Sequence, residues 1–97
     1  MSEQRWTFLS NHSHVLICIV SNPEITLREL SDRVGITERA VHKIIGDLVQ
    51  AGYLEKLREG RKNRYRVNPT LPLRHPVEAH CPVGDLLAMV GLRDLDR

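Results

Sequence analysis

Along the first half of the chain, apolar residues recur at helical spacing. Ser10 or Asn11 can cap a first helix. Its apolar face is predicted to comprise Val15, Leu16, Ile19 and Val20. Ile17 widens this stripe, which indicates burial on a second side, and Pro23 prevents the helix from continuing. The pattern therefore predicts one helix that ends near residue 21.

Two further helices follow, joined by a glycine turn. Thr26 and Glu29 have the spacing of a capping box, and Gly35 is placed to end that helix. Thr37 can cap the next helix, which Gly52 ends. The predicted core positions are Leu27, Leu30 and Val34 in the first of these helices and Val41, Ile44, Ile45, Leu48 and Val49 in the second.

Beyond the third helix the apolar period changes to two, which is typical of β-strands. Two alternating runs flank residues 59–62, so we predict a hairpin with its tip there. Two strands alone are marginally stable, so the hairpin is expected to lean on the helices through Leu57, Tyr65 and Val67. Ile25 is predicted to lie in a short strand beside it.

The last third of the chain combines a proline-rich segment with an apolar one. Pro69, Pro72 and Pro76 prevent a helix there, so residues 69–82 are predicted to form an extended connector. Residues 83–95 are predicted to form a helix whose apolar face comprises Val83, Leu86, Leu87, Val90 and Leu92. Such a short helix is not stable alone, so it must pack on its own first helix or on a second subunit.

Length and composition restrict the class of protein. With 97 residues, the chain is expected to form one domain with residues 10–68 as its core. No apolar run approaches the length of a membrane span, and the N-terminus lacks the pattern of a secretory signal. We therefore expect a cytoplasmic protein without a membrane partner, in which Cys18 and Cys81 remain reduced thiols.

The charge is unevenly distributed. The net charge is only +2, but the segment from Tyr53 to Arg66 holds six cations and two carboxylates and so carries +4. The predicted hairpin is therefore strongly basic. On the third helix, Arg39, His42 and Lys43 share the polar face, where Arg could grip guanine through two hydrogen bonds.

Helix, glycine turn, helix and basic hairpin, in this order, indicate a winged helix-turn-helix. The predicted fold is α+β, mostly α: a three-helix core, a β-hairpin wing and an extra C-terminal helix. This fold would place the third helix in the major groove of duplex DNA and the wing on the backbone or in the minor groove. The predicted DNA-binding residues are Thr37, Arg39, His42, Lys43, Arg61, Lys62 and Arg64.

The middle of the chain resembles the winged helix-turn-helix of MarR-like and ArsR-like transcription regulators. The resemblance rests on TLRELSDRVGITERAVHKIIGDLVQAGYLEK followed by REGRKNRYRV. It implies a sequence-specific DNA-binding regulator that acts as a homodimer through its terminal helices. The long extra helices of the usual MarR-like dimer and ligand pocket are lacking, so no small-molecule effector is expected. The predicted dimer interface comprises Trp6, Phe8, Ile17, Leu86, Leu87 and Val90.

Other classes of protein receive less support from the sequence. There is no nucleophile elbow, phosphate loop or paired-carboxylate motif, so we expect neither an enzyme nor a cofactor. His75, His80 and Cys81 lack the usual spacing of metal ligands, although their meeting across a dimer stays open. The alternative function is a winged-helix protein–protein interaction module without specific DNA binding. The basic hairpin argues against it, since docking alone needs no concentrated charge.

Overall fold

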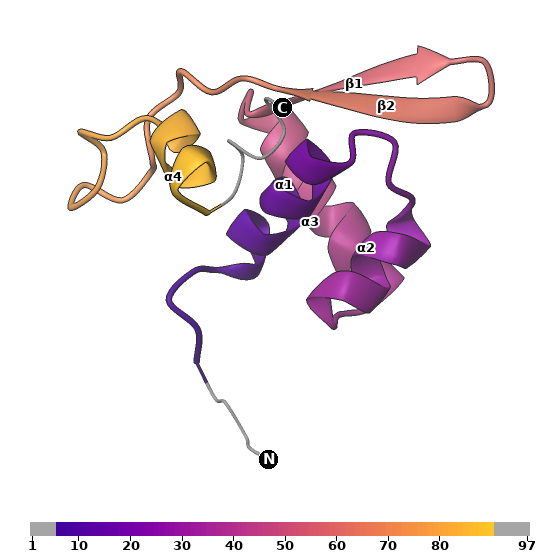
Figure 1. Ribbon diagram of the computed structural model, residues 1–97, viewed down its shortest axis with the longest axis horizontal. Helices are drawn as coiled ribbons and strands as arrows, with labels where there is room; N and C mark the ends of the chain where they lie inside the picture. The colour runs from indigo at the N-terminus through magenta and orange to yellow at the C-terminus, as the bar shows by residue number, and fades with distance from the viewer. Residues whose placement is uncertain (1–5, 91–97) are drawn as a thin grey trace.

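The computed structural model describes residues 6–90, which form three helices, a β-hairpin and a C-terminal helix (Figure 1). The fold is the α+β winged helix that the sequence predicts. Residues 91–95 of the predicted last helix, including Leu92, lie outside the described residues. The elements are α1 (Asn11–Ser21), α2 (Leu27–Val34), α3 (Glu38–Gln50), β1 (Leu54–Glu59), β2 (Lys62–Val67) and α4 (Val83–Val90).

The boundaries of the first three helices follow from their capping residues. The side chains of Ser10, Thr26 and Thr37 each accept a hydrogen bond from a backbone N–H three residues later. Glu29 completes the predicted capping box by accepting from the Thr26 N–H. Gly35 ends α2 with a φ of +84°, the left-handed conformation that glycine adopts at little cost. These local predictions are confirmed.

One hydrophobic core joins the helices to the hairpin. Val15 of α1, Leu30 of α2 and Val41 of α3 are all fully buried. Val49 was predicted to be buried with Val41, but its side chain is 37% exposed. The helical rotation carries it about 80° around α3 from Val41, which puts it at the edge of the buried stripe.

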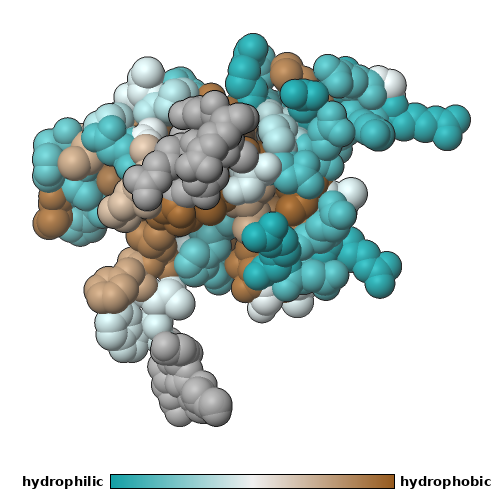
Figure 2. All heavy atoms as spheres, in the orientation of Figure 1, coloured by the Kyte–Doolittle hydropathy of each residue, from teal (hydrophilic) through white to brown (hydrophobic). Residues whose placement is uncertain are grey.

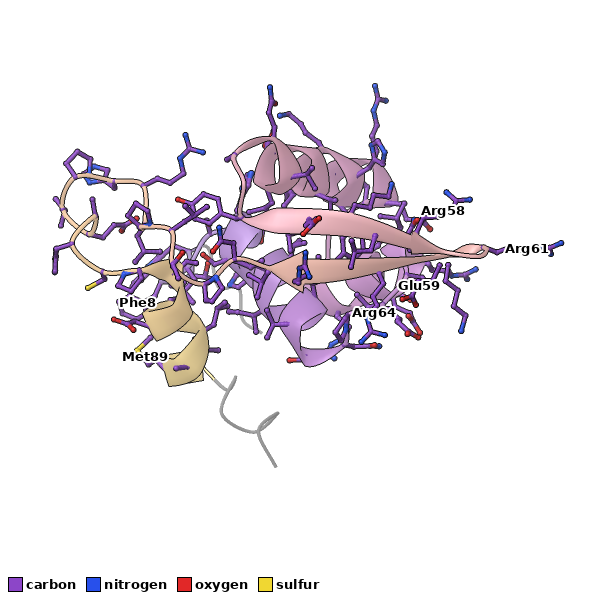
Figure 3. The ribbon with its side chains drawn as sticks, turned by 90° about the horizontal axis from the view of Figure 1, so that it is seen from above. Phe8, Arg58, Glu59, Arg61, Arg64 and Met89 are labelled. Atoms are coloured by element: carbon purple, nitrogen blue, oxygen red, sulfur yellow. The ribbon has the colours of Figure 1, made fainter. Side chains whose placement is uncertain are left out.

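The wing, residues 54–67, is an antiparallel hairpin with a two-residue turn. Glu59 pairs with Lys62, so Gly60 and Arg61 make the turn. Gly60 has a φ of +64°, whereas no residue other than glycine has a positive φ in the described part of the chain. A glycine with positive φ at the first turn position is typical of the type II′ hairpin. This turn places Arg61 at the tip of the wing (Figure 3).

Only one face of the wing packs on the helices. Leu54 and Tyr65 are buried there, and Val67 is packed against the same core. Burial also raises the pKa of the Tyr65 hydroxyl. Leu57 pairs with Arg64 and lies on the other face, because successive residues of a strand alternate in direction. The prediction that Leu57 holds the wing on the helices is therefore wrong.

The loop between α1 and α2 runs along the free edge of β2. The Tyr65 N–H donates to the Pro23 carbonyl with an N···O distance of 3.1 Å, and Ile25 is buried behind this contact. No strand forms at Ile25, so the predicted third strand is wrong. A single backbone hydrogen bond replaces it and sets Glu24 beside the wing.

The connector between β2 and α4 folds back on itself. The Leu73 N–H donates to the Cys81 carbonyl at 2.9 Å, and the Val83 N–H donates to the Leu71 carbonyl at 2.7 Å. Turn hydrogen bonds within residues 75–81 reverse the chain between these two contacts. The predicted extended course is wrong, although Leu71 and Leu73 do pack against the core as expected.

The last helix packs on the chain that carries it. Val83 is buried, and Leu87 is only 2% exposed within this single chain. Leu87 was predicted to lie in a dimer interface, but the structure makes it a core residue. The Gly84 N–H donates to the Pro69 carbonyl at 2.9 Å. A Cβ at position 84 would lie 2.9 Å from that same oxygen, so this close contact requires glycine.

Candidate nucleic-acid interface

The N-terminal half of α3 presents polar side chains away from the core. Arg39, His42 and Lys43 are all exposed, whereas Val41 and Ile44 between and beyond them are buried. Thr37 is exposed at the start of the helix, where the first backbone N–H groups have no helical partners. The structure therefore brings the four predicted residues of this element together on one accessible surface.

The wing presents the second group of predicted residues. Arg61, Lys62 and Arg64 are exposed, and Figure 3 shows Arg61 at the end of the hairpin that points away from the helices. Hydrophilic atoms cover the wing in Figure 2. Arg58 has a structural role, because its Nε donates a hydrogen bond to the Gly60 carbonyl at 3.3 Å and so stabilises the turn.

Two of these wing cations are paired with a carboxylate that the sequence analysis did not single out. Arg64 Nη1 lies 3.1 Å from Glu24 Oε2, and Lys62 Nζ lies 4.0 Å from Glu24 Oε1. Glu24 and Arg64 are forty positions apart, so no local spacing links them. Glu24 thus places a negative charge beside two of the three predicted DNA-binding residues of the wing.

A second carboxylate lies beside the polar face of α3. His12 Nε2 of α1 is 2.9 Å from Asp47 Oδ2, and Lys43 Nζ is 3.5 Å from Asp47 Oδ1. The hydrogen bond from His12, with the help of the Lys43 ammonium, holds the pKa of the Asp47 carboxyl below its ordinary value, although desolvation acts in the opposite direction. Asp47 therefore ties α1 to α3 and offsets part of the charge of Lys43.

The remaining arginines of α3 and the wing differ in whether a carboxylate lies beside them. Arg66 pairs with Glu55 across the hairpin, on the face that does not touch the helices. Arg39 and Arg61 form no salt bridge within residues 6–90. These two side chains, one on α3 and one at the wing tip, are the predicted contacts that carry an uncompensated charge.

The predicted dimer residues fall into two groups. Trp6 and Phe8 are 68% and 92% exposed, and their rings stack edge to face with centroids 5.1 Å apart. They contact each other and do not dock on the core, and their contact with a second subunit stays a prediction. Ile17 and Leu86 are half-buried, and Val90 is exposed.

Met89, which the sequence analysis missed, is also an exposed apolar residue. It falls outside the predicted stripe of its helix, so periodicity gave no signal for it. Phe8 and Met89 both lie at the end of the molecule opposite to Arg61 (Figure 3). Figure 2 shows hydrophobic atoms gathered over α4 and the adjoining part of α1.

A cleft of about 700 Å³ opens between α1, the end of α3, the connector and α4. The connector forms one wall of this cleft because it folds back on itself between β2 and α4. Its walls include His12, Leu16, Asp47, Leu48, Leu73 and Leu86.

Other chemistry is limited in this part of the chain. Among the described residues, no cluster of three or more His, Cys, Asp or Glu side chains could hold a metal ion. Cys18 and Cys81 are free thiols. No helix between residues 6 and 90 is long and apolar enough to cross a membrane.

Residues 10–55 match a family model described as winged helix-turn-helix DNA-binding. These residues form a winged helix-turn-helix DNA-binding domain. The regulators that share this domain are not enzymes, which agrees with the expectation from the sequence. No curated protein matches the chain.

Solved structures of MarR-family transcription regulators resemble the winged helix-turn-helix domain and its flanking elements. The PcaV regulator from Streptomyces coelicolor is 27% identical over 61% of this chain and 46% of its own, with a TM-score of 0.52. PcaV in complex with its natural ligand is matched over 91% of this chain and 61% of its own, at 23% identity and a TM-score of 0.55.

MepR, a transcription regulator of the Staphylococcus aureus multidrug efflux pump MepA, has a TM-score of 0.57 at 8% identity. The match covers 90% of this chain and 59% of MepR, and at this identity it shows the fold alone. The chain thus spans about half the length of the regulators that it matches.

Proposed function

We propose that the protein is a sequence-specific transcription regulator that binds duplex DNA as a homodimer. In this proposal α3 enters the major groove, and the wing contacts the backbone or the minor groove. The observation that carries the proposal is the exposed basic wing on a winged helix-turn-helix DNA-binding domain. A module that only docks on proteins has no need of this charge.

Each group of residues has a proposed role. Arg39 and His42 would read base edges, since Arg39 is exposed and free of salt bridges within the described chain. Thr37 and the free N–H groups at the start of α3 suit a phosphate. Arg61 at the wing tip would reach the backbone or the minor groove, where arginine is favoured. Lys43 would add a phosphate contact.

Binding to DNA is tested by fluorescence anisotropy with labelled duplexes. We expect binding to any duplex at low salt, with the logarithm of the affinity falling linearly with the logarithm of the salt concentration. A duplex selected from a random pool should bind tighter than its scrambled control by a factor on the order of 10³. Absence of binding at low salt would instead support the interaction-module function.

The homodimer is proposed to form through the exposed apolar side chains at the end of the molecule opposite to the wing tip, which include Trp6, Phe8 and Met89. Replacing Trp6 and Phe8 together by alanine should shift the protein from dimer to monomer in sedimentation equilibrium, because large exposed aromatic side chains supply contact area at low entropic cost. The fold should be unchanged by circular dichroism, since neither side chain touches the core.

The matched control for this variant is Val77→Ala, which removes an apolar side chain that is exposed on the connector. It should leave the dimer intact. A Trp6 and Phe8 variant that remains dimeric at the same concentration would rule out this interface. Deleting α4 is a poorer test, because Val83 and Leu87 belong to the core of their own chain.

A further inference from the structure

Glu24 is held at a fixed place beside the wing. The Tyr65 N–H donates to the carbonyl of Pro23, which precedes Glu24, and Ile25, which follows Glu24, is buried. The Glu24 N–H also donates to Asn22 Oδ1 at 3.3 Å. The backbone on both sides of Glu24 is thus anchored, so its carboxylate does not depend on a loose surface loop for its position.

The two carboxylate oxygens of Glu24 face two different cations. Oε2 accepts from Arg64 Nη1 at 3.1 Å, and Oε1 lies 4.0 Å from Lys62 Nζ. Arginine uses the same N–H donors to bind carboxylates and phosphates. A DNA phosphate that approaches Lys62 and Arg64 must therefore displace this carboxylate or share the cations with it.

The pairing is selective within the basic surface. Arg61, three residues from Arg64, forms no salt bridge within the described chain, whereas Lys62 and Arg64 both face Glu24. Exposed ion pairs contribute little to folding. The wing itself is held by its strand pairing and by the buried side chains of Leu54 and Tyr65, so it does not need Glu24 for its stability.

We propose that Glu24 is an intramolecular competitor of DNA phosphate for Lys62 and Arg64, which lowers the affinity of the wing for any duplex. This inference rests on the proposed function. Its consequence is selectivity: weaker contacts to the backbone leave a larger share of the binding free energy to the bases read by α3. Glu24 therefore sets how strongly the protein prefers its own site over other DNA.

The test is Glu24→Gln in the full chain, measured by anisotropy on a scrambled duplex between about 50 and 200 mM salt. The variant should bind roughly three- to tenfold tighter at the low-salt end, and its salt dependence should be steeper by about one to two released counterions. Glu78→Gln is the matched control, since it removes the same charge from the connector, away from the wing.

A double variant identifies the cation involved. Adding Glu24→Gln to Arg64→Ala should change the affinity much less than adding it to the wild-type protein, because the main partner is then missing. Equal effects in both backgrounds would overturn the inference.

Other results would overturn the inference as well. If wild-type protein binds DNA and Glu24→Gln behaves like Glu78→Gln, Glu24 does not compete. Weaker binding by Glu24→Gln would show that the carboxylate positions the wing for DNA. Absence of wild-type binding would overturn the proposed function and the role of Glu24 together.

Discussion

Replacing Arg61, Lys62 and Arg64 together by alanine is expected to weaken binding to every duplex sequence by at least about tenfold at low salt. The three side chains are exposed on the wing, and Arg61 lies at its tip. Contacts of this kind neutralise phosphates and release counterions. The salt dependence should therefore become shallower by up to about 0.9 for each contact that is lost.

The measurement is a salt series in anisotropy on a selected duplex and on its scrambled control. Both affinities should fall by a similar factor, because phosphate contacts carry no sequence information. Arg74→Ala, on the exposed connector, is the control for a cation removed far from the wing tip. If the slope of the triple variant equals that of the wild-type protein, the phosphate contacts lie elsewhere on the surface.

Leu30→Ala is expected to lower the free energy of unfolding by about 2–5 kcal/mol. Leu30 is completely buried in α2 and belongs to the core that α1 and α3 share. Its truncation removes contacts on several sides and leaves a cavity, because the surrounding side chains relax only partly into the space. In a domain of this size, the midpoint of thermal unfolding should fall by on the order of 10 °C or more.

Calorimetry or thermal denaturation followed by circular dichroism measures this loss. Val49→Ala is the control, because Val49 lies on α3 but is partly exposed, and it should cost less than about 1 kcal/mol. A Leu30 variant as stable as the Val49 variant would mean that the three-helix core is not the main source of stability.

The sequence was most informative where structure depends on neighbouring residues. Thr26 and Glu29 are three positions apart, and their reciprocal hydrogen bonds need nothing from the rest of the chain. Gly35 and Gly60 likewise mark backbone conformations that other residues rarely adopt. The order of helices, turn and wing could therefore be predicted, as could the accessible positions on α3.

The errors arose where distant segments meet. The apolar period of α4 is the same whether Leu87 packs on its own chain or on a second copy, so the sequence could not choose between them. The course of the connector depends on the backbone hydrogen bonds of Leu73 with Cys81 and of Val83 with Leu71, which leave no pattern in the side chains. The pairing of Glu24 with Arg64 depends on how the loop after α1 docks on β2.

The tight contact between Gly84 and Pro69 connects the two ends of the molecule. Pro69 follows the last residue of β2 by two positions, and Gly84 lies in the first turn of α4. Because Gly84 and Pro69 are in direct contact, a shift of α4 would displace Pro69 and with it the end of β2. In the proposed homodimer, a partner subunit that contacts α4 would therefore influence where the wing lies on the DNA backbone.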